Sequence, residues 1–440
     1  MAAAKSLSVT LLGLIVLAVL GFGGYTLFKD MEGPVLTLTP DTGRASPTLE
    51  MSLSARDAKS GIRSITVTVK KNSHSLVVLD KHFSEARPEQ SVTFNLKEAG
   101  LRDGAFDLEV KSSDTSLAGF GKGNTTTRVV AMRMDVQPPR ISLKTMPPYV
   151  RRGGTGCVLY TVSEEVGKTG IKVGDLFFPA HQQPNGEYMA FFAFPHFLTV
   201  QQYAPEIMAQ DLAGNVTQSR LSFHPIDRPF KHDNIPLSDN FLNSKMPDFV
   251  GAIPDAPNHL ERFLQVNSKL RVANEKALLD IGRNTAPTML WKGAFVRLPN
   301  SANRAGFADT RSYIYNGQKV DEQTHLGLDL ASLAMAPIPA AANGKVVFAG
   351  DLGIYGLLVV IDHGLGLMTL YSHMSEITVP VGTELKQGDT IGRTGTTGLA
   401  GGDHLHFGVM IAGVQVQPLE WLDPHWIKDN VMDRLYPKQP

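Results

Sequence analysis

The sequence predicts a mostly β protein made of several folded units, and three observations carry this prediction. The chain has 440 residues, which at roughly 150 residues per domain gives about three units. Apolar residues alternate with polar ones in short runs, as at Ile65, Val67 and Val69, and such alternation is typical of half-buried strands. The C-terminal third is rich in glycine and β-branched residues, with apolar runs such as Leu357–Ile361.

Composition narrows the range of functions. Lys plus Arg and Asp plus Glu both total 42, so the formal net charge is zero. We therefore expect no nucleic-acid partner, because phosphate binding requires a basic face. Apolar residues make up 42% of the chain, which excludes general disorder. Cys157 is the single cysteine; we expect a buried core thiol there, and a metal site would have to use histidines and carboxylates.

The N-terminal segment determines the predicted compartment. Residues 7–28 carry no charge and are numerous enough to span a bilayer. The alternative is a cleaved secretory signal, but no small-residue cleavage site is present after the apolar run, so we favour an uncleaved transmembrane helix. Lys5 precedes this span, and the positive-inside rule then places the rest of the chain outside the cytoplasm. The sequence thus predicts an envelope protein, anchored in the inner membrane and facing the periplasm or the cell-wall side.

Two β-sandwich modules are predicted next, at residues 34–136 and 137–226. The start of the second, Pro138–Leu143, repeats the pattern at Pro34–Leu38. The second module contains Asp211–Asn215 near its end, and this stretch resembles the turn before the last strand of bacterial immunoglobulin-like domains. Such modules act as spacers or adhesion surfaces, and neither contains a recognisable catalytic motif.

Residues 227–290 are predicted to form a linker followed by one long helix. Pro, Asp and Asn are frequent up to Pro257, which is typical of a linker. Asn258 and Glu261 are spaced as a capping box, and Gly282 stands where a helix C-cap is expected. An apolar stripe follows the helical period: Phe263, Val266, Leu270, Ala273, Ala277 and Ile281. The stripe could form a coiled-coil dimer, but we favour packing against the neighbouring domain, where the helix could also limit access to a groove.

The candidate chemistry lies in residues 291–427. Three histidine motifs occur there: His325 with Asp329 four residues on, Tyr371–His373, and His404 with His406 after the glycine-rich stretch Gly395–Asp403. Residues at even separations share one face of a strand, so His325 and Asp329 would point the same way, as would His404 and His406. Each of these motifs, taken alone, is also common where the histidines serve only the fold. Their occurrence together favours a catalytic zinc site, which needs three N or O ligands, with the remaining histidines moving protons or stabilising an oxyanion.

Two other histidines have a structural interpretation. His363 lies in the stretch Ile361-Asp362-His363-Gly364, and His425 lies beside Trp426. We expect both to serve the fold rather than the site.

The same segment resembles the lysostaphin-type, or LytM-like, zinc endopeptidases of peptidoglycan. The matching stretches are His325–Asp329, Val359–Gly364, Tyr371–Met374, Gly388–Gly392 and Gly402–Gly408. The resemblance implies an antiparallel β domain with a narrow groove, a substrate of extended cross-linking stem peptides, and one Zn²⁺ per chain. It also implies that His325, Asp329 and His406 hold the zinc, while His373 and His404 act on the attacking water and the tetrahedral intermediate.

One departure from that family is visible. Its members often have Phe-Gly upstream of the first ligand, before an arginine; here the stretch reads Phe307-Ala308-Asp309-Thr310-Arg311. The glycine is a backbone position, so the change is expected to alter the rim of the groove rather than the metal site.

The sequence therefore predicts a zinc metalloendopeptidase, a hydrolase that cuts peptide cross-links of bacterial peptidoglycan outside the cytoplasmic membrane. Some members of the resembled family lack zinc ligands and activate amidases, but this chain keeps all five positions. Two alternatives stay open: a non-catalytic activator of a cell-wall amidase, and an adhesion or wall-binding protein whose sandwich modules carry the function.

Overall fold

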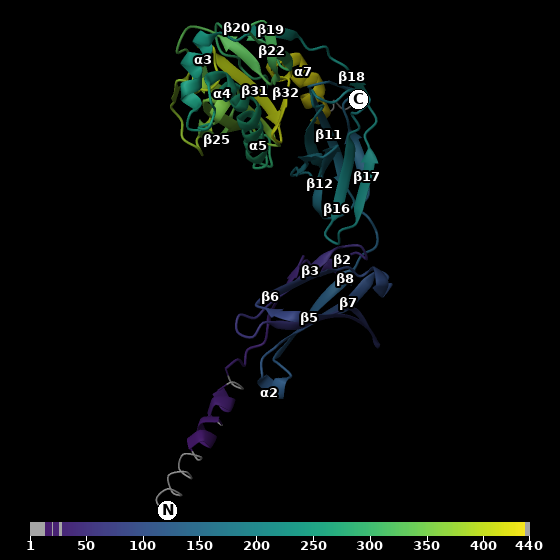
Figure 1. The fold of residues 1–440 in the computed structure, drawn as a ribbon. Helices are drawn as coiled ribbons and strands as arrows, with labels where there is room; N and C mark the ends of the chain where they lie inside the picture. Colours follow the sequence, from purple (N-terminus) through teal and green to yellow (C-terminus); the bar gives the residue numbers. More distant parts are fainter. Residues whose placement is uncertain (1–13, 20, 26–28, 436–440) are drawn as a thin grey trace, which may run out of the picture. The chain divides into compact units, whose positions relative to one another are not determined.

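The computed structural model describes residues 14–19, 21–25 and 29–435, and Figure 1 shows their elements. Within these ranges, no helix is long and apolar enough to cross a membrane. The transmembrane helix predicted at residues 7–28 falls in part on residues that lie outside the described ones. The rest of the chain is mostly β, as predicted, and forms two compact units, one built chiefly from residues up to 139 and the other chiefly from those after it.

The first unit contains a sandwich of a three-stranded and a five-stranded sheet. The sheets comprise β1 (Val35–Thr39), β3 (Met51–Arg56) and β6 (Glu89–Phe94), and β2 (Arg44–Ala45), β8 (Thr125–Met134), β7 (Gly104–Asp114), β4 (Ile62–Lys71) and β5 (His74–Arg87). On β4, Ile65, Val67 and Val69 are all buried, and Val67 lies opposite Val110 of β7. The predicted alternation is confirmed, because one face of each strand supplies the core.

The second sandwich has two four-stranded sheets. They comprise β14 (His181–Gln182), β15 (Tyr188–Ala193), β11 (Thr155–Val162) and β9 (Ile141–Thr145), and β13 (Leu176–Pro179), β12 (Val166–Val173), β16 (Glu206–Asp211) and β17 (Val216–Arg220). Cys157 on β11 is buried as expected, and burial raises the pKa of its thiol to about 12. Phe191 meets Trp421 of the C-terminal domain edge to face, with ring centroids 5.4 Å apart. The sandwich and the C-terminal domain therefore share one core rather than forming separate units.

The side chain of Glu420 places an ionisable carboxyl group in this shared core. It belongs to α6 (Pro418–Leu422), is buried, and accepts a hydrogen bond from the backbone N–H of Thr155 at 2.9 Å. Burial raises its pKa from 4.5 to about 7. Because the folded chain holds this proton more tightly than the unfolded chain, Glu420 lowers the stability progressively as pH rises from about 4.5 to 7.

We expect Glu420→Gln to raise the free energy of unfolding at pH 8 by about 2–3 kcal/mol, since the amide keeps the acceptor oxygen and removes the buried charge. At pH 4 the wild-type carboxyl is protonated, so the two chains should be equally stable. Urea unfolding of the full chain at both pH values measures the effect, and exposed Glu165→Gln is the matched control. Equal stability of wild type and Glu420→Gln at pH 8 would contradict the expectation.

The predicted linker before the helix is wrong, because this stretch is folded into the C-terminal domain. β19 (His232–Pro236) pairs in parallel with β21 (Asp309–Tyr315), which pairs with β22 (Gln318–His325). Next along the chain is α3 (Asp239–Lys245), with Ser238 as its N-cap, and Leu242 is buried. The prolines and polar residues that indicated a linker in fact form the edge of a sheet and a helix start.

The long helix is confirmed as one continuous helical stretch, but its register differs from the prediction. α4 (His259–Gln265) leads through a π-helical segment (Val266–Leu270) into α5 (Arg271–Ile281). The Asn258 side chain accepts from the N–H of Glu261 at 2.8 Å, as a cap should. The wider π turn rotates the rest of the helix about its axis, so the buried positions include Asn267 and Asn274, while Ala273 is exposed.

The helix packs on the C-terminal domain, which confirms packing over a coiled coil. Phe263, Val266 and Leu278 belong to the same apolar cluster as Tyr355 and Leu358. The same cluster includes Met410 of β31 (Leu405–Ile411).

Gly282 is the C-cap of the helix, as predicted, and its φ of −63° is one that any residue adopts. It is required for another reason. A Cβ on Gly282 would lie 2.2 Å from the backbone N of Gly413, so the bare backbone lets the end of the helix approach the hairpin at that residue.

An eight-stranded antiparallel sheet forms the centre of the C-terminal domain. It comprises β20 (Ala302–Ala305), β23 (Leu328–Ala331), β31, β27 (Leu367–Met374), β26 (Leu357–Asp362), β25 (Gly344–Asp351) and β29 (Glu384–Leu385), with β32 (Val414–Val416) paired to β31. A smaller sheet contains β24 (Pro337–Pro339), β30 (Thr390–Arg393) and β28 (Glu376–Ile377). In the central register Asp329 lies opposite His406, which brings two of the sequence-predicted site residues together.

Short elements complete the described part of the chain. They are β10 (Tyr149–Arg151) and β18 (His224–Ile226), α2 (Ala118–Gly121), α7 (Pro424–Ile427), α8 (Asp433–Leu435), a π segment at Lys428–Met432, and 3₁₀ turns at Lys97–Ala99, Met246–Phe249 and Gly353–Tyr355.

Candidate metal centre and active site

Three strands bring His325, Asp329 and His406 to one place. His325 is the last residue of β22, Asp329 lies in β23, and His406 lies in β31. The expectation that His325 and Asp329 share a strand is wrong, because the chain turns between them. Gly327 stands in this turn, where a Cβ would lie 2.5 Å from the ring of His406. Only glycine therefore lets the turn pass so close to the third residue.

One polar atom of each side chain lies within hydrogen-bonding distance of the other two. His325 Nε2 lies 2.8 Å from Asp329 Oδ1 and 2.9 Å from His406 Nδ1, and His406 Nδ1 lies 3.0 Å from the same Asp329 oxygen. All three residues are buried. Two nitrogens and one carboxylate oxygen in a tight triangle could hold a metal ion, and this donor set suits zinc.

Hydrogen bonding supports a cation at this triangle. His325 Nδ1 lies 2.8 Å from the carbonyl oxygen of Gly306, which can only accept, so Nδ1 carries the proton and neutral His325 has a lone pair on Nε2. That lone pair faces a carboxylate oxygen, and two lone pairs at this distance repel unless a proton or a cation lies between them. His406 Nε2 is buried without a partner in the described chain. The pattern is the one in which a metal-binding histidine donates its other N–H to a carbonyl.

Arg311 fixes the orientation of the carboxylate. Its guanidinium donates to the second oxygen of Asp329 at 2.7 Å, which leaves Oδ1 facing the histidines. Burial raises the pKa of Asp329. When protons rather than a cation lie between the side chains, the charge of His325 and hydrogen bonds from three histidines outweigh this effect and hold the pKa well below its ordinary value. Asp329 is therefore ionised, as a metal ligand must be. The sequence indicated Arg311 only as part of a motif.

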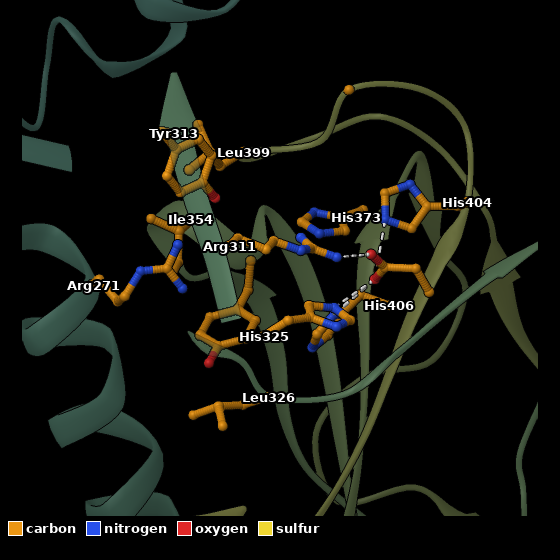
Figure 2. Close-up of a pocket in the computed structure, with 13 residues that line it drawn as sticks. Arg271, Arg311, Tyr313, His325, Leu326, Ile354, His373, Leu399, His404 and His406 are labelled. Atoms are coloured by element: carbon orange, nitrogen blue, oxygen red, sulfur yellow. Dashed lines mark hydrogen bonds and ion pairs between the residues drawn. The ribbon is translucent and has the colours of Figure 1, made fainter. Parts of the chain in front are cut away.

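His373 and His404 lie beside the triangle and are oriented alike. Each directs Nδ1 to a backbone carbonyl at 2.8 Å, His373 to Thr397 and His404 to Gly402, so each Nε2 is available for a substrate or water. Their rings are 4.9 Å apart, and His404 Nε2 lies 3.5 Å from Asp329 Oδ1. Figure 2 shows the rings of His373 and His404 above those of His325 and His406.

The two histidines have opposite proton affinities. Burial and the neighbouring His406 and His404 lower the pKa of His373 well below its usual value. Burial also lowers the pKa of His404, but hydrogen bonding and charge from Asp329 reverse this and leave it raised. Two titratable groups with separated pKa values can act as an acid and a base.

Two backbone positions near the site are strained. His373 has φ +62° and Ala308 has φ +63°, a region that non-glycine residues rarely adopt. Ala308 is the residue where the resembled family often has glycine, and its N–H donates to the carbonyl of His325 at 2.6 Å. Ala308 therefore holds a left-handed backbone conformation next to the first candidate ligand.

The histidines expected to be structural lie away from the triangle. His363 is buried, with Nδ1 2.7 Å from the Asn343 carbonyl and Nε2 2.8 Å from Thr369 Oγ1. His425 is exposed. Both ring nitrogens of His363 are thus used by the fold.

A pocket of about 160 Å³ opens over the site. Besides the five predicted residues and Arg311, it is lined by residues that the sequence reasoning missed: Arg271, Tyr313, Leu326, Ile354, Tyr355, Leu399 and Gly401. These come from the long helix, from β21 and from loops. Their place in the pocket depends on tertiary packing and had no local sequence signal.

The part of the chain that contains this site is similar in sequence to known proteins. Residues 323–418, which contain all five predicted site residues, match Peptidase family M23. Lipoprotein NlpD of Yersinia enterocolitica is 39% identical over 95 residues, which are 21% of this chain and 97% of that sequence. The chain belongs to peptidase family M23.

Other M23 relatives differ in the activity that their names state. DD-carboxypeptidase/endopeptidase Mpg of Neisseria meningitidis is 39% identical over 95 residues, 22% of either chain. Murein hydrolase activator EnvC of Escherichia coli is 33% identical over 108 residues, 24% of this chain and 26% of its own. The chain thus spans about a quarter of the length of these two relatives.

Proposed function

We propose that this protein is a zinc-dependent endopeptidase that hydrolyses peptide cross-links of peptidoglycan. The observation that carries the proposal is the buried triangle of His325 Nε2, Asp329 Oδ1 and His406 Nδ1, with two further histidines directed at the same pocket. An M23 relative named for endopeptidase activity supports the reaction type, and another named as a murein hydrolase activator supports peptidoglycan as the material.

The residues present fit one zinc ion. His325, Asp329 and His406 would hold it, since all three are buried and orient lone pairs towards one another. When bound, Zn²⁺ polarises a carbonyl and lowers the pKa of a water molecule towards 7. Arg311 keeps the Asp329 carboxylate in the orientation that this requires.

His373 and His404 would be the catalytic residues. Each Nδ1 is occupied by a backbone carbonyl, so each acts through Nε2. His404, with its raised pKa, can hold a proton near neutral pH and donate it to a leaving amine. His373 is kept neutral by burial and by its histidine neighbours, so it can accept a proton or donate one hydrogen bond to a developing oxyanion.

Peptidoglycan lies outside the cytoplasmic membrane, so we also propose an extracytoplasmic location with the M23 domain on the cell-wall side. The uncharged stretch at residues 7–28 and the preceding Lys5 support export. We propose that this stretch anchors the chain in the inner membrane, and that the two sandwiches act as immunoglobulin-like spacers.

The alternative is a non-catalytic activator of a cell-wall amidase, because a relative bears the name of an activator. All five polar site residues are retained and converge here, which favours the enzyme: an activator has no need of three buried lone pairs facing one another.

Digestion of purified, cross-linked peptidoglycan by the full chain tests the proposal. We expect loss of cross-linked dimers on muropeptide analysis, abolished by a chelator and restored by added zinc. No cleavage by a folded chain that carries zinc would reject the enzyme and favour the activator.

A further inference from the structure

Arg271 brings a positive charge into the pocket from outside the matched M23 region. It is the first residue of α5, and it lines the same pocket as the five candidate site residues. Figure 2 shows its side chain extending from the helix towards the side of the pocket that holds Arg311 and the histidines. Moving a charged side chain from bulk water into a groove costs free energy. An interaction in the groove must therefore offset this cost.

The guanidinium is held in place without being neutralised. Its Nε and Nη2 donate to the side-chain oxygen of Asn267, one turn earlier on the helix. Asn267 is fully buried and donates its own amide N–H to Asp321 of β22. Arg271 forms no ion pair with the residues that the structure describes, none of them accepts a hydrogen bond from its Nη1, and the side chain lines the pocket.

The carboxyl group of Glu275 forms no ion pair with the Arg271 guanidinium. Glu275 lies one turn further along the helix and lines a different cavity. Burial raises the pKa of Glu275, with Arg271 opposing this shift without an ion pair between them. The one acidic residue that lines the pocket with Arg271 is Asp329, and Arg311 and the histidines already engage it.

The helix is built to present this side chain. The π segment places Asn267 and Arg271 on the buried side, where a regular helix with the predicted stripe would place apolar residues. Further on, Asn274 accepts from the N–H of Ile354 at 3.0 Å, and Ile354 lines the pocket. Polar contacts therefore join the helix to β22 and to the turn at Ile354, and Arg271 extends from the helix into the pocket lining.

A planar guanidinium with free N–H groups recognises carboxylates through paired hydrogen bonds. The peptides that cross-link peptidoglycan carry free carboxylates at branch points and chain ends. We propose that Arg271 is a specificity-determining residue that binds a free carboxylate of the peptide substrate and positions the scissile bond over His404 and His373. This inference rests on the proposed function.

The test compares two substrates: a cross-linked stem-peptide dimer, and the same dimer with every free carboxylate converted to an amide. With the full chain, we expect the carboxylate form to be cleaved with a kcat/KM about 10- to 100-fold higher, as for one charge-assisted contact. Arg271→Gln should lose this preference mainly through a higher KM, and should cleave the amide form as wild type does. That second result also shows that the variant is folded.

Two further variants sharpen the comparison. Lys269→Gln removes an exposed cation from the same helix, whose ammonium donates to Gln265, and should keep the full preference. Arg271→Lys keeps the charge without the paired donors and should retain part of the preference. An Arg271→Gln variant that cleaves the carboxylate form as well as wild type, or that loses both substrates equally, would overturn the inference.

Binding separates this inference from the proposed function. If wild type cleaves neither dimer, the endopeptidase proposal fails. The dissociation constants of the two dimers then test whether Arg271 binds a free carboxylate. Tighter binding of the carboxylate form that disappears in Arg271→Gln would support the anchoring role. Equal binding by both chains, or no binding at all, would reject it.

Discussion

Replacing His325 with alanine is expected to abolish zinc binding and peptidoglycan cleavage together. His325 Nε2 contacts both other candidate ligands, at 2.8 Å and 2.9 Å, so its loss leaves two ligands where a catalytic zinc needs three. Changes to groups that merely orient ligands cost about 10- to 100-fold in metal affinity, and removing a ligand should cost more. We expect about one zinc per wild-type chain by elemental analysis, close to none in His325→Ala, and no released muropeptides.

Thermal stability gives a second readout of the same event. Zinc at about 100 times its dissociation constant should stabilise wild type by about 2.7 kcal/mol, and His325→Ala should show no such gain. His425→Ala is the control, because His425 is exposed and lies outside the pocket; its zinc content and activity should match wild type. A His325→Ala chain that still binds one zinc tightly would contradict the ligand assignment.

The sequence predicted the histidine motifs because their signals are local, and the family resemblance implied which of their residues are ligands. Three signals depend only on spacing within a few residues, which tertiary packing does not change. They are the alternation at Ile65–Val69, the Asn258 cap and the histidine motifs. The partnership of Asp329 and His406 arises from pairing between β23 and β31. Residues 77 positions apart in the chain could be brought together only through the family resemblance.

The errors came from features that tertiary contacts determine. His325 and Asp329 lie on two strands because Gly327 lets the chain turn against His406, and a period-two pattern cannot show such a turn. The composition around His232–Pro236 is typical of a linker, but its backbone pairs with β21, which lies far along the chain. The π turn before Arg271 had no signal in the apolar stripe, so the side chain that it presents to the pocket went unnoticed.

The choice between enzyme and activator depends on His404. Its Nε2 is 3.5 Å from Asp329 Oδ1, outside the triangle of candidate ligands, so His404→Ala should keep one zinc per chain. As a proton donor positioned at the pocket, it should contribute about 10²- to 10⁴-fold to kcat. We therefore expect cleavage of cross-linked muropeptides to fall by that factor with little change in KM, measured on the zinc-loaded full chain.

The same variant discriminates the two functions in cells. An activator works through its surface, and a change to one half-buried side chain inside the pocket would leave that surface intact. An enzyme that cannot cleave would fail to replace the wild-type chain even when folded and correctly located. We expect His404→Ala to fail in this way while His425→Ala succeeds, and normal growth supported by a His404→Ala chain without measurable cleavage would mean that the histidines are retained for a role other than catalysis.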